Sequence, residues 1–312
     1  MELSKIEMRD AAFEKLFLAA KHNPNIVVIS NDFGAPSLDR FRSELPNQFI
    51  NAGIAEQNII AVAAGMALGG KRVYVYSIAS FITLRCLEQI KIDLCVMNLP
   101  VTILGVGPGY GYGQDGPTHH ATEDLASMRS LANLNIYSPA DANTVEALIT
   151  KTLHSTNPAY IRLDRGKWPL VHNLQEDFSQ GFAQLCEGQD VCLVSTGIMT
   201  HRAIEVAQEL QKHSIESAVI DIYRLKPLQA EALLKSITRS KRVVTIEEHA
   251  LNGGLGSLIV ELLADQASPM PIKRCAISDA LLYDYGTRAL LHQKNGLDRE
   301  GLVKTVVSWM QK

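Results

Sequence analysis

Short apolar segments alternate with longer segments of helical periodicity along most of the chain. Apolar residues at helical spacing predict a helix over 5–20, and the run Ile-Val-Val-Ile predicts a buried strand over 26–29. The same pattern predicts further helices at 56–68, 83–95, 121–131 and 141–153, and further strands at 73–76, 101–104, 135–137 and 159–163. Short apolar strands between amphipathic helices are typical of a mainly parallel sheet with helices on both faces.

The alternation lapses between Gly166 and Gly188 and then starts again. The second set has predicted strands at 191–195, 217–222, 242–246 and 272–277, and predicted helices at 200–212, 228–237, 254–263 and 299–310. We therefore predict an α/β fold of two α/β domains with mainly parallel sheets. The first domain covers residues 1–170 and the second covers 188–312, with residues 171–187 as the linker between them.

Composition narrows the class of protein. The 312 residues are 46% apolar and 20% charged with a net charge of −3, which excludes a disordered chain and gives no broad basic surface for nucleic acid. The longest apolar run, near 58–68, is shorter than the roughly 20 residues that span a bilayer, and no basic start with an apolar segment opens the chain. Five widely spaced cysteines without a CxxC pair indicate buried thiols rather than a metal site. We expect a soluble, cytoplasmic protein.

Polar and glycine-rich segments follow three of the predicted strands of the first domain, at 30–34, 51–57 and 105–120. Ligands of open α/β sheets bind beyond the carboxyl ends of the strands. The third segment, the Gly-rich loop, contains six glycines in sixteen residues and ends with Asp115 and His119 before a helix. Long loops of this kind are more often functional than structural. Each signal alone has an ordinary alternative: Glu56 could favour a helix N-terminus, and His119 with His120 could be a solvated pair.

Taken in order, these segments resemble the transketolase family of thiamine diphosphate enzymes. The run 51–57 with Ala-Val-Ala-Ala-Gly-Met-Ala at 61–67 resembles the segment that carries the family's glutamate. The match continues with Gly-Gln-Asp-Gly-Pro-Thr-His at 113–119, Glu-Asp-Leu-Ala-Ser-Met-Arg at 123–129, Ser-Pro-Ala-Asp at 138–141, Tyr-Ile-Arg-Leu-Asp-Arg at 160–165, Ser-Thr-Gly at 195–197, Thr-Ile-Glu-Glu-His at 245–249 and Gly-Gly-Leu-Gly-Ser at 253–257. The resemblance therefore spans nearly the whole chain.

One element of the family is missing. The diphosphate and its divalent metal, Mg²⁺ or Ca²⁺, are bound in the family through a GDG…N motif, and this sequence has no Gly-Asp-Gly. The resemblance therefore implies the pyrimidine-binding and C-terminal subunit of a split transketolase, with a partner subunit that holds the diphosphate and metal. It also implies a dimer of this chain within an α2β2 assembly. The C-terminal domain would make dimer contacts, and His249 would be structural.

The resemblance assigns cofactor-binding roles to residues at the strand ends. Glu56 would hydrogen-bond the aminopyrimidine ring nitrogen, which works best when a partly apolar site keeps the carboxyl protonated. Phe81 would stack on that ring, with membership of the ordinary core as its alternative. Asp32 would lie near the thiazolium, and Ile54 would line the cofactor site beside Glu56.

Substrate-binding roles follow in the same way. Asp115 would bind a substrate hydroxyl, and His119 would serve a hydroxyl or carbonyl during ketol transfer. Arg9 and Arg165 stand where the family binds sugar phosphates, with a surface position as the alternative. The family's phosphate-binding His is replaced by Gly107, so a different sugar is expected. Neighbouring Tyr110 and Tyr112 could donate hydrogen bonds to it.

Three other functions compete with ketol transfer. The beta subunit of a 2-oxoacid dehydrogenase has the same layout and glutamate, but its loop usually lacks the Asp of Gln-Asp-Gly-Pro-Thr-His. A deoxyxylulose phosphate synthase is also similar, although it normally keeps both halves in one chain. A non-catalytic paralogue is the third alternative, and the intact Glu56 argues against it.

Overall fold

The computed structural model describes residues 3–32, 34–280 and 283–312. They form two compact units, and the chain crosses between them after residues 108, 126, 137, 140 and 176. The first unit contains 127–137 and 141–176 as well as the N-terminal 108 residues, and the second contains 109–126, 138–140 and everything from 177 onward. Much of the Gly-rich loop thus packs with the second unit, and the domain bounds expected from the sequence stay a prediction.

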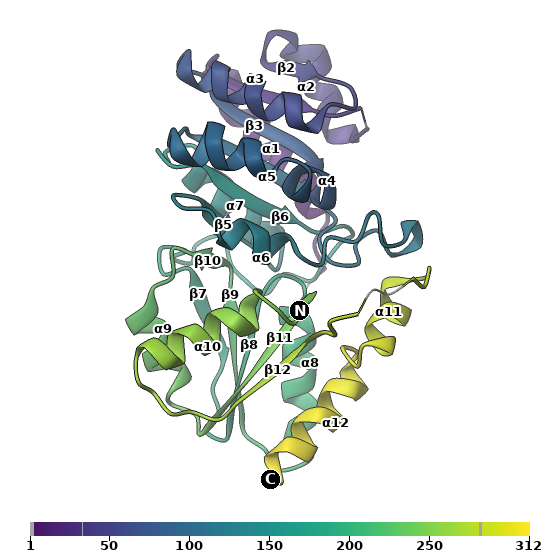
Figure 1. Cartoon of the computed structure of the whole chain (residues 1–312), viewed down its shortest axis with the longest axis vertical. Helices are drawn as coiled ribbons and strands as arrows, with labels where there is room; N and C mark the ends of the chain where they lie inside the picture. The colour runs from purple at the N-terminus through teal and green to yellow at the C-terminus, as the bar shows by residue number, and fades with distance from the viewer. Residues whose placement is uncertain (1–2, 33, 281–282) are drawn as a thin grey trace. The chain divides into compact units, whose positions relative to one another are not determined.

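The first unit is built on parallel strands, as the unbroken apolar runs predict. Its strands are β1 (Ile26–Ser30), β2 (Phe49–Asn51), β3 (Arg72–Ile78), β4 (Val101–Val106), β5 (Asn135–Tyr137) and β6 (Ala159–Leu163). They lie in the order β5-β6-β4-β3-β1-β2, and each neighbouring pair is parallel. All of their carboxyl ends therefore meet at one edge of the sheet (Figure 1).

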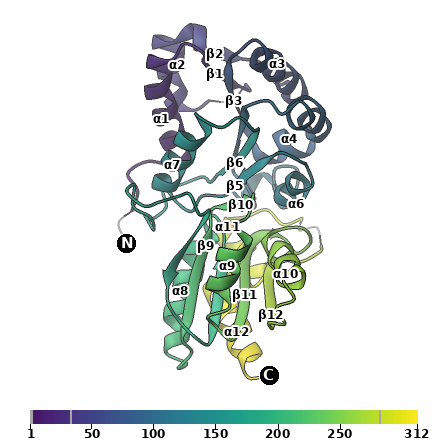
Figure 2. The same ribbon diagram turned by 90° about the vertical axis from the view of Figure 1, so that its left-hand side faces the viewer.

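Helices cover both faces of this sheet. They are α1 (Met8–His22), α2 (Asp39–Glu44), α3 (Glu56–Leu68), α4 (Ala79–Leu84), α5 (Leu87–Gln89), α6 (Asp124–Arg129) and α7 (Ala142–Thr152), with short 3₁₀ turns η1 (Pro36–Leu38) and η2 (Pro46–Gln48). Figure 2 shows α1, α2 and α7 on one face of the sheet and α3 and α4 on the other. Phe13 of α1 packs edge-on against Tyr76 of β3, with ring centroids 4.9 Å apart.

The single helix predicted over 83–95 has a different form. It begins at Ala79 with α4, breaks at Arg85 and Cys86, continues as α5 and ends as the π-helix η3 (Ile90–Val96). The residue before α4, Ile78, makes no side-chain capping bond, so the sequence carries no start signal there. As a result, Phe81 lies inside α4 rather than ahead of a helix.

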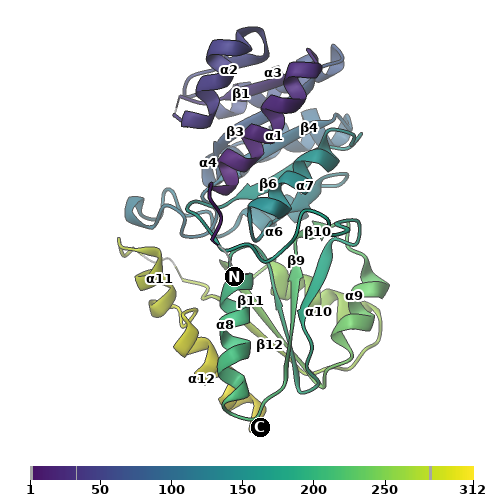
Figure 3. The same cartoon turned by 180° about the vertical axis from the view of Figure 1, so that it is seen from behind.

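The second unit has a five-stranded sheet of order β12-β11-β8-β9-β7. Its strands are β7 (Phe182–Cys186), β8 (Val191–Ser195), β9 (Ser217–Ile222), β11 (Arg242–Ala250) and β12 (Ile272–Ile277), and β10 (Arg224–Lys226) is a short strand after β9. Its helices are α8 (Met199–Gln211), α9 (Ala230–Ile237), α10 (Leu255–Asp265), α11 (Arg288–Lys294) and α12 (Arg299–Met310), and η4 (Gly113–Asp115) is a 3₁₀ turn in the Gly-rich loop. Figure 3 shows α8 and α12 together on one face.

The strand β7 and the helix α11 of the second unit are absent from the sequence prediction, as is the short strand β10. The strand β7 falls in the expected linker and pairs antiparallel with β9 at the edge of the sheet, where its half-buried residues give no clear apolar pattern. The helix α11 has only seven residues, although the side chain of Thr287 caps it by accepting a hydrogen bond from the Leu290 N–H. A capping threonine is a readable helix start, but a helix this short has little periodicity to support it.

Candidate active site

A tight turn between β2 and α3 places one group of candidate residues at the carboxyl edge of the first sheet. Gly53 adopts the left-handed backbone conformation, with φ of 67°. Its carbonyl accepts hydrogen bonds from the Asn31 side-chain amide at 2.9 Å and from the Asp32 N–H at 3.3 Å. In this turn Ile54 is 82% exposed. Helix α3 begins directly after it at Glu56, which is only 5% exposed. Asp32, Ile54 and Glu56 therefore belong to one structural feature.

Arg85 joins Glu56 to Phe81. Its Nη1 lies 2.8 Å from Glu56 Oε2, and its guanidinium carbon lies 4.6 Å from the centroid of the Phe81 ring. The backbone of Arg85 is held as well, because the Gln57 side-chain amide donates a hydrogen bond to the Arg85 carbonyl at 3.1 Å. We call Glu56, Phe81 and Arg85 the Glu56 cluster.

The Glu56 cluster adds a partner that the sequence analysis does not include. A partly apolar site is expected around Glu56, and the structure also places the Arg85 guanidinium against its carboxyl group. Arg85 is not recognised in the sequence analysis. It stands four residues after Phe81, a spacing that places two side chains on the same side of a helical turn, and this is the available signal.

The predicted phosphate-binding arginines lie in the same unit. Arg165 is exposed and follows β6, and Arg9 is near the start of α1. The segment before α1 and the segment after β6 are joined by a hydrogen bond, in which the Ser4 N–H donates to the Trp168 carbonyl at 3.1 Å. The Arg9 guanidinium is 2.9 Å from a carboxylate oxygen of Asp10, and the pKa of Arg9 is raised because its acidic neighbours outweigh the effect of burial. A phosphate at Arg9 would compete with these carboxylates.

The Gly-rich loop holds the other two candidates together in the second unit. Gly109 and Ala121 close the loop at its base with two backbone hydrogen bonds of 2.9 Å. Inside it, η4 ends at Asp115, which is exposed, and the His119 N–H donates to the Gly116 carbonyl at 3.0 Å. Asp115 and His119 therefore flank one tight turn.

A buried ionic group lies under this loop. Glu248, 4% exposed, accepts hydrogen bonds from Arg288 Nε at 2.8 Å and His292 Nε2 at 2.5 Å, and Arg288 Nη2 donates to its other oxygen. Burial alone would raise the pKa of Glu248, but Arg288 and His292 outweigh it, and the pKa lies well below its ordinary range. We call Glu248, Arg288 and His292 the Glu248 cluster.

The Glu248 cluster fixes the start of the Gly-rich loop. A Cβ on Gly109, whose φ is 58°, would lie 2.3 Å from Glu248 Oε2, so only glycine fits there. The Tyr110 ring meets the His120 ring edge-on at 4.9 Å, and its hydroxyl accepts a hydrogen bond from the Asn295 amide at 3.2 Å. Tyr110 is buried, and burial raises its pKa to about 12; its substrate-binding role stays a prediction.

The sequence analysis assigns no role to Glu248. The available signal is the pair Glu247-Glu248 at the end of a buried strand, because acidic side chains are rarely buried unless they are paired. Glu247 has a separate structural role: its carboxylate accepts hydrogen bonds from the Leu255 and Gly256 N–H groups at the start of α10, at 2.6 and 2.7 Å. His249 accepts a hydrogen bond from the Ala126 N–H at 3.2 Å.

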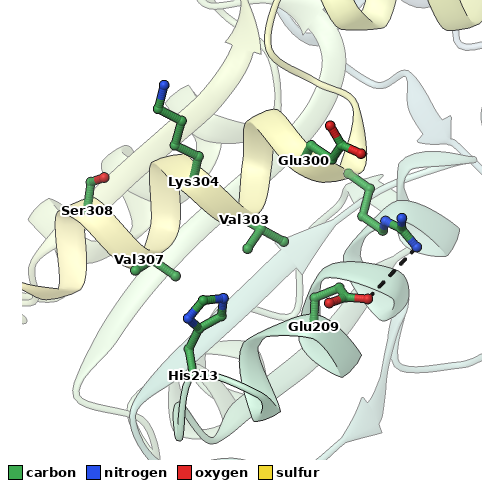
Figure 4. Close-up of a pocket in the computed structure, with 8 residues that line it drawn as sticks. Glu209, His213, Glu300, Val303, Lys304, Val307 and Ser308 are labelled. Carbon is green, nitrogen blue, oxygen red and sulfur yellow. Dashed lines mark ion pairs between the residues drawn. The ribbon is translucent and has the colours of Figure 1, made fainter.

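The described residues of the second unit form a cavity beside the Gly-rich loop. Its volume is about 390 Å³, and it is lined by Tyr110, Pro117, His120, Thr122, Glu123, Ala250, Asn252, Ile277, Ser278, Asp279 and Ala280. A groove of about 430 Å³ lies between α8 and α12 (Figure 4). Its charges compensate each other, since Arg299 lies 3.9 Å from Glu209, and Val303 and Val307 form its apolar side. It contains none of the predicted site residues.

Comparisons with known proteins decide the family. Residues 4–170 match the transketolase pyrimidine binding domain, and residues 182–302 match the transketolase C-terminal domain. The chain belongs to the transketolase family. Its two matched regions lie on either side of residues 171–181, and β7 begins where the second match begins.

Relatives of this transketolase-family chain include proteins that are named as subunits of transketolases. It is 34% identical over 315 residues to one subunit of the apulose-4-phosphate transketolase of Phocaeicola vulgatus, covering 100% of both chains. It is 32% identical to one subunit of a 6-deoxy-6-sulfo-D-fructose transketolase of Clostridium sp., covering 97% and 94%. A solved split gene transketolase, described as an inactive beta4 tetramer, superposes with a TM-score of 0.89 and 35% identity over 98% and 99%.

The transketolase-family chain lacks two kinds of feature in its described ranges. Within 3–32, 34–280 and 283–312, no group of three or more His, Cys, Asp or Glu side chains could hold a metal ion. Among the helices of that same part of the chain, none is both long enough and apolar enough to cross a membrane.

The thiols of this chain are expected to react slowly in the folded state. None of the five cysteines, all of which the structure describes, forms a disulfide. Burial raises the pKa of Cys192 to about 12 and that of Cys275 to about 11, so about one thiol in 10³ to 10⁴ is ionised at pH 8. Iodoacetamide labelling followed by mass spectrometry should modify the less buried Cys186 first. Rapid labelling of Cys192 in the folded chain would contradict this prediction.

Proposed function

We propose that this chain is the pyrimidine-binding component of a split, thiamine diphosphate-dependent transketolase. It would transfer a two-carbon ketol unit from a ketose to an aldose acceptor together with a partner subunit. The observation that carries the proposal is the Glu56 cluster: a buried carboxylate at the start of α3, beside an aromatic ring and an exposed isoleucine, at the carboxyl edge of a parallel sheet. The names of the relatives support the same assignment.

The residues of the first unit fit an aminopyrimidine ring. Such a ring needs a carboxyl group for its ring nitrogen and flat apolar surfaces for its faces. Glu56 offers the carboxyl, while Phe81 offers an aromatic face and Ile54 an apolar side chain open to a ligand. Asp32 is joined to the same turn through the Gly53 carbonyl. When bound, thiamine diphosphate supplies the nucleophilic carbon that cleaves the ketose.

The roles of this chain's own residues follow from their chemistry. Glu56 would hold a proton at the ring nitrogen of the aminopyrimidine, and Phe81 would fix the plane of that ring. Asp115 and His119, at the two ends of their turn, would bind substrate hydroxyl groups, and His119 would also move a proton at the substrate oxygen. Both lie on a loop whose base is closed by paired backbone bonds, which favours a fixed geometry.

We propose that the diphosphate and its Mg²⁺ or Ca²⁺ are held mainly by the partner subunit. The apolar surface of α3 and of the segment from α4 to η3 supports an interface. Its exposed apolar residues are Ile54, Val62, Leu68, Leu84, Ile92, Val96 and Met97. Large exposed apolar surfaces in soluble proteins mark interaction sites. We propose an α2β2 assembly, and sedimentation that shows only a monomer in the presence of the partner would contradict it.

The sugar substrate is proposed to differ from common sugar phosphates. Gly107 occupies the position of the expected phosphate-binding histidine, and its φ of 70° is a left-handed conformation that disfavours a histidine there. Tyr112, half-buried in the same loop, is the uncharged side chain that we propose for substrate contact. One relative is named for a phosphorylated sugar and another for a sulfonated one. The terminal group of the substrate is therefore the property to test.

The proposed function predicts activity only in the reconstituted pair. This chain would be mixed with a GDG-containing transketolase subunit from the same organism, with thiamine diphosphate and Mg²⁺. Ketol transfer would be followed from phosphorylated, sulfonated and unsubstituted ketoses, with each subunit alone as the control. We expect transfer from at least one ketose by the pair and none by either subunit. Decarboxylation of a 2-oxoacid without ketol transfer would instead support the dehydrogenase alternative.

A further inference from the structure

One guanidinium makes contact with both groups that the aminopyrimidine would use. Arg85 binds the Glu56 carboxylate at 2.8 Å and lies over the Phe81 ring at 4.6 Å. The two charged side chains differ in environment, because that of Glu56 is 6% exposed whereas that of Arg85 is 45% exposed. The cation therefore reaches from solvent to a buried carboxylate across the face of an aromatic ring.

A guanidinium resembles the ring that we propose for this site in shape and bonding. It is flat, it stacks on aromatic faces, and its N–H groups bind a carboxylate in its own plane. A heteroaromatic ring that stacks on the same face of Phe81 and hydrogen-bonds the same oxygen of Glu56 would need the volume that the Arg85 guanidinium fills. Both cannot make these contacts at the same time.

We propose that Arg85 is a placeholder that pairs with Glu56 in the free chain and is displaced when the cofactor's aminopyrimidine binds. This inference rests on the proposed function, because it takes thiamine diphosphate as the ligand. The side chain can move while the backbone stays, since the Arg85 carbonyl is held by Gln57 at 3.1 Å and the Phe81 carbonyl by the Cys86 thiol at 3.8 Å.

The placeholder has a physical reason. A buried carboxylate without a partner is costly, so the free chain needs a cation at Glu56 before the cofactor arrives. Because the partner is a half-exposed arginine, it can be released into water, where its charge is well solvated. Arg85 thus protects Glu56 in the free chain and competes weakly with the cofactor.

The test compares Arg85→Met with Arg42→Met. Arg42 is the matched control, because it too pairs with a carboxylate, Asp39 at 2.5 Å, and lies over a ring, Phe49 at 5.1 Å, but on α2. Thiamine diphosphate binding to the reconstituted pair would be measured by calorimetry. We expect Arg85→Met to bind the cofactor about three- to tenfold more tightly, the range expected when one half-exposed guanidinium no longer competes through an ion pair and a cation–π contact. Arg42→Met should bind like the parent.

Unchanged or weaker binding by Arg85→Met would overturn the proposal, because Arg85 would then not compete with the cofactor. If Arg85→Met does not fold, Arg85→Gln serves in the same comparison.

A second readout needs no cofactor. A double-mutant cycle of Arg85→Met and Glu56→Gln, measured on the unfolding free energy of the isolated chain, should show a stabilising coupling between the two side chains. Absence of this coupling would show that the ion pair does not stabilise the free chain and would overturn the proposal. If the reconstituted pair with the unsubstituted chain binds no thiamine diphosphate, both the proposed function and the Arg85 proposal fail. If the parent binds and only the Arg85 result is negative, the proposed function stands.

Discussion

Glu56→Gln is expected to lower kcat of the reconstituted enzyme by about 10²- to 10⁴-fold, the range for loss of one acid–base group. Glutamine keeps the size of the side chain, so α3 should still begin at this position. Its amide cannot hold and release a proton at a ring nitrogen. Steady-state rates of ketol transfer, with thermal unfolding of the isolated chain to confirm the fold, would measure the effect.

Glu44→Gln is a suitable control for Glu56→Gln, because Glu44 is an exposed glutamate at the end of α2 that pairs with Lys21 at 3.6 Å. Its substitution should leave kcat within a factor of about two, since exposed ion pairs contribute little. If Glu56→Gln kept the full rate in an active pair, the carboxyl would have no catalytic role. That result would favour the alternative of a subunit retained only for assembly.

Glu248→Ala is expected to destabilise the chain by about 3–5 kcal/mol, the typical cost of removing one partner of a buried ion pair. The alanine would leave the Arg288 side chain, 17% exposed, without its carboxylate. It would also remove the group against which Gly109 and the start of the Gly-rich loop pack. Urea unfolding would give the free energy, and a loss below about 1 kcal/mol would contradict the importance of the Glu248 cluster.

The same residue predicts a pH dependence. A carboxyl whose pKa is lowered by folding stabilises the folded state above its ordinary pKa of 4.5, and that contribution is lost as the pH falls below this value. The parent chain should therefore lose more stability between about pH 5 and pH 3 than Glu248→Gln does. Parallel curves for the two proteins would show that Glu248 is not the carboxyl responsible.

Local patterns are sufficient for most of the fold. The predicted strands at 135–137, 159–163, 191–195, 217–222 and 272–277 have the bounds that the structure shows. Strands 159–163, 191–195 and 217–222 are short, largely apolar runs that are fully buried, whereas 272–277 contains Lys273 and Arg274 and is mostly half-buried. The edge strand β7 escapes prediction because its pairing with β9 decides its conformation, and a half-buried edge carries no strong pattern.

Only those residues of the candidate site that belong to sequence motifs can be predicted from the sequence. The motifs lead to Glu56, Phe81, Asp115 and His119, and their proposed roles remain predictions. The sequence does not reveal Arg85 or Glu248, because their importance comes from what they contact in space. Glu248, for example, contacts two side chains of α11, Arg288 and His292, that lie 40 and 44 positions later, and no spacing rule connects them.

The repeated crossings of the chain between its two units have a consequence for dissection. A single cut near residue 177 would yield two fragments, but the C-terminal one would lack residues 109–126 and 138–140, which pack with it. Recombinant 177–312 should therefore expose the surface that normally holds the Gly-rich loop and should aggregate on its own. Co-expression with 1–176 should restore a soluble complex held together without a covalent link, in the manner of fragment complementation.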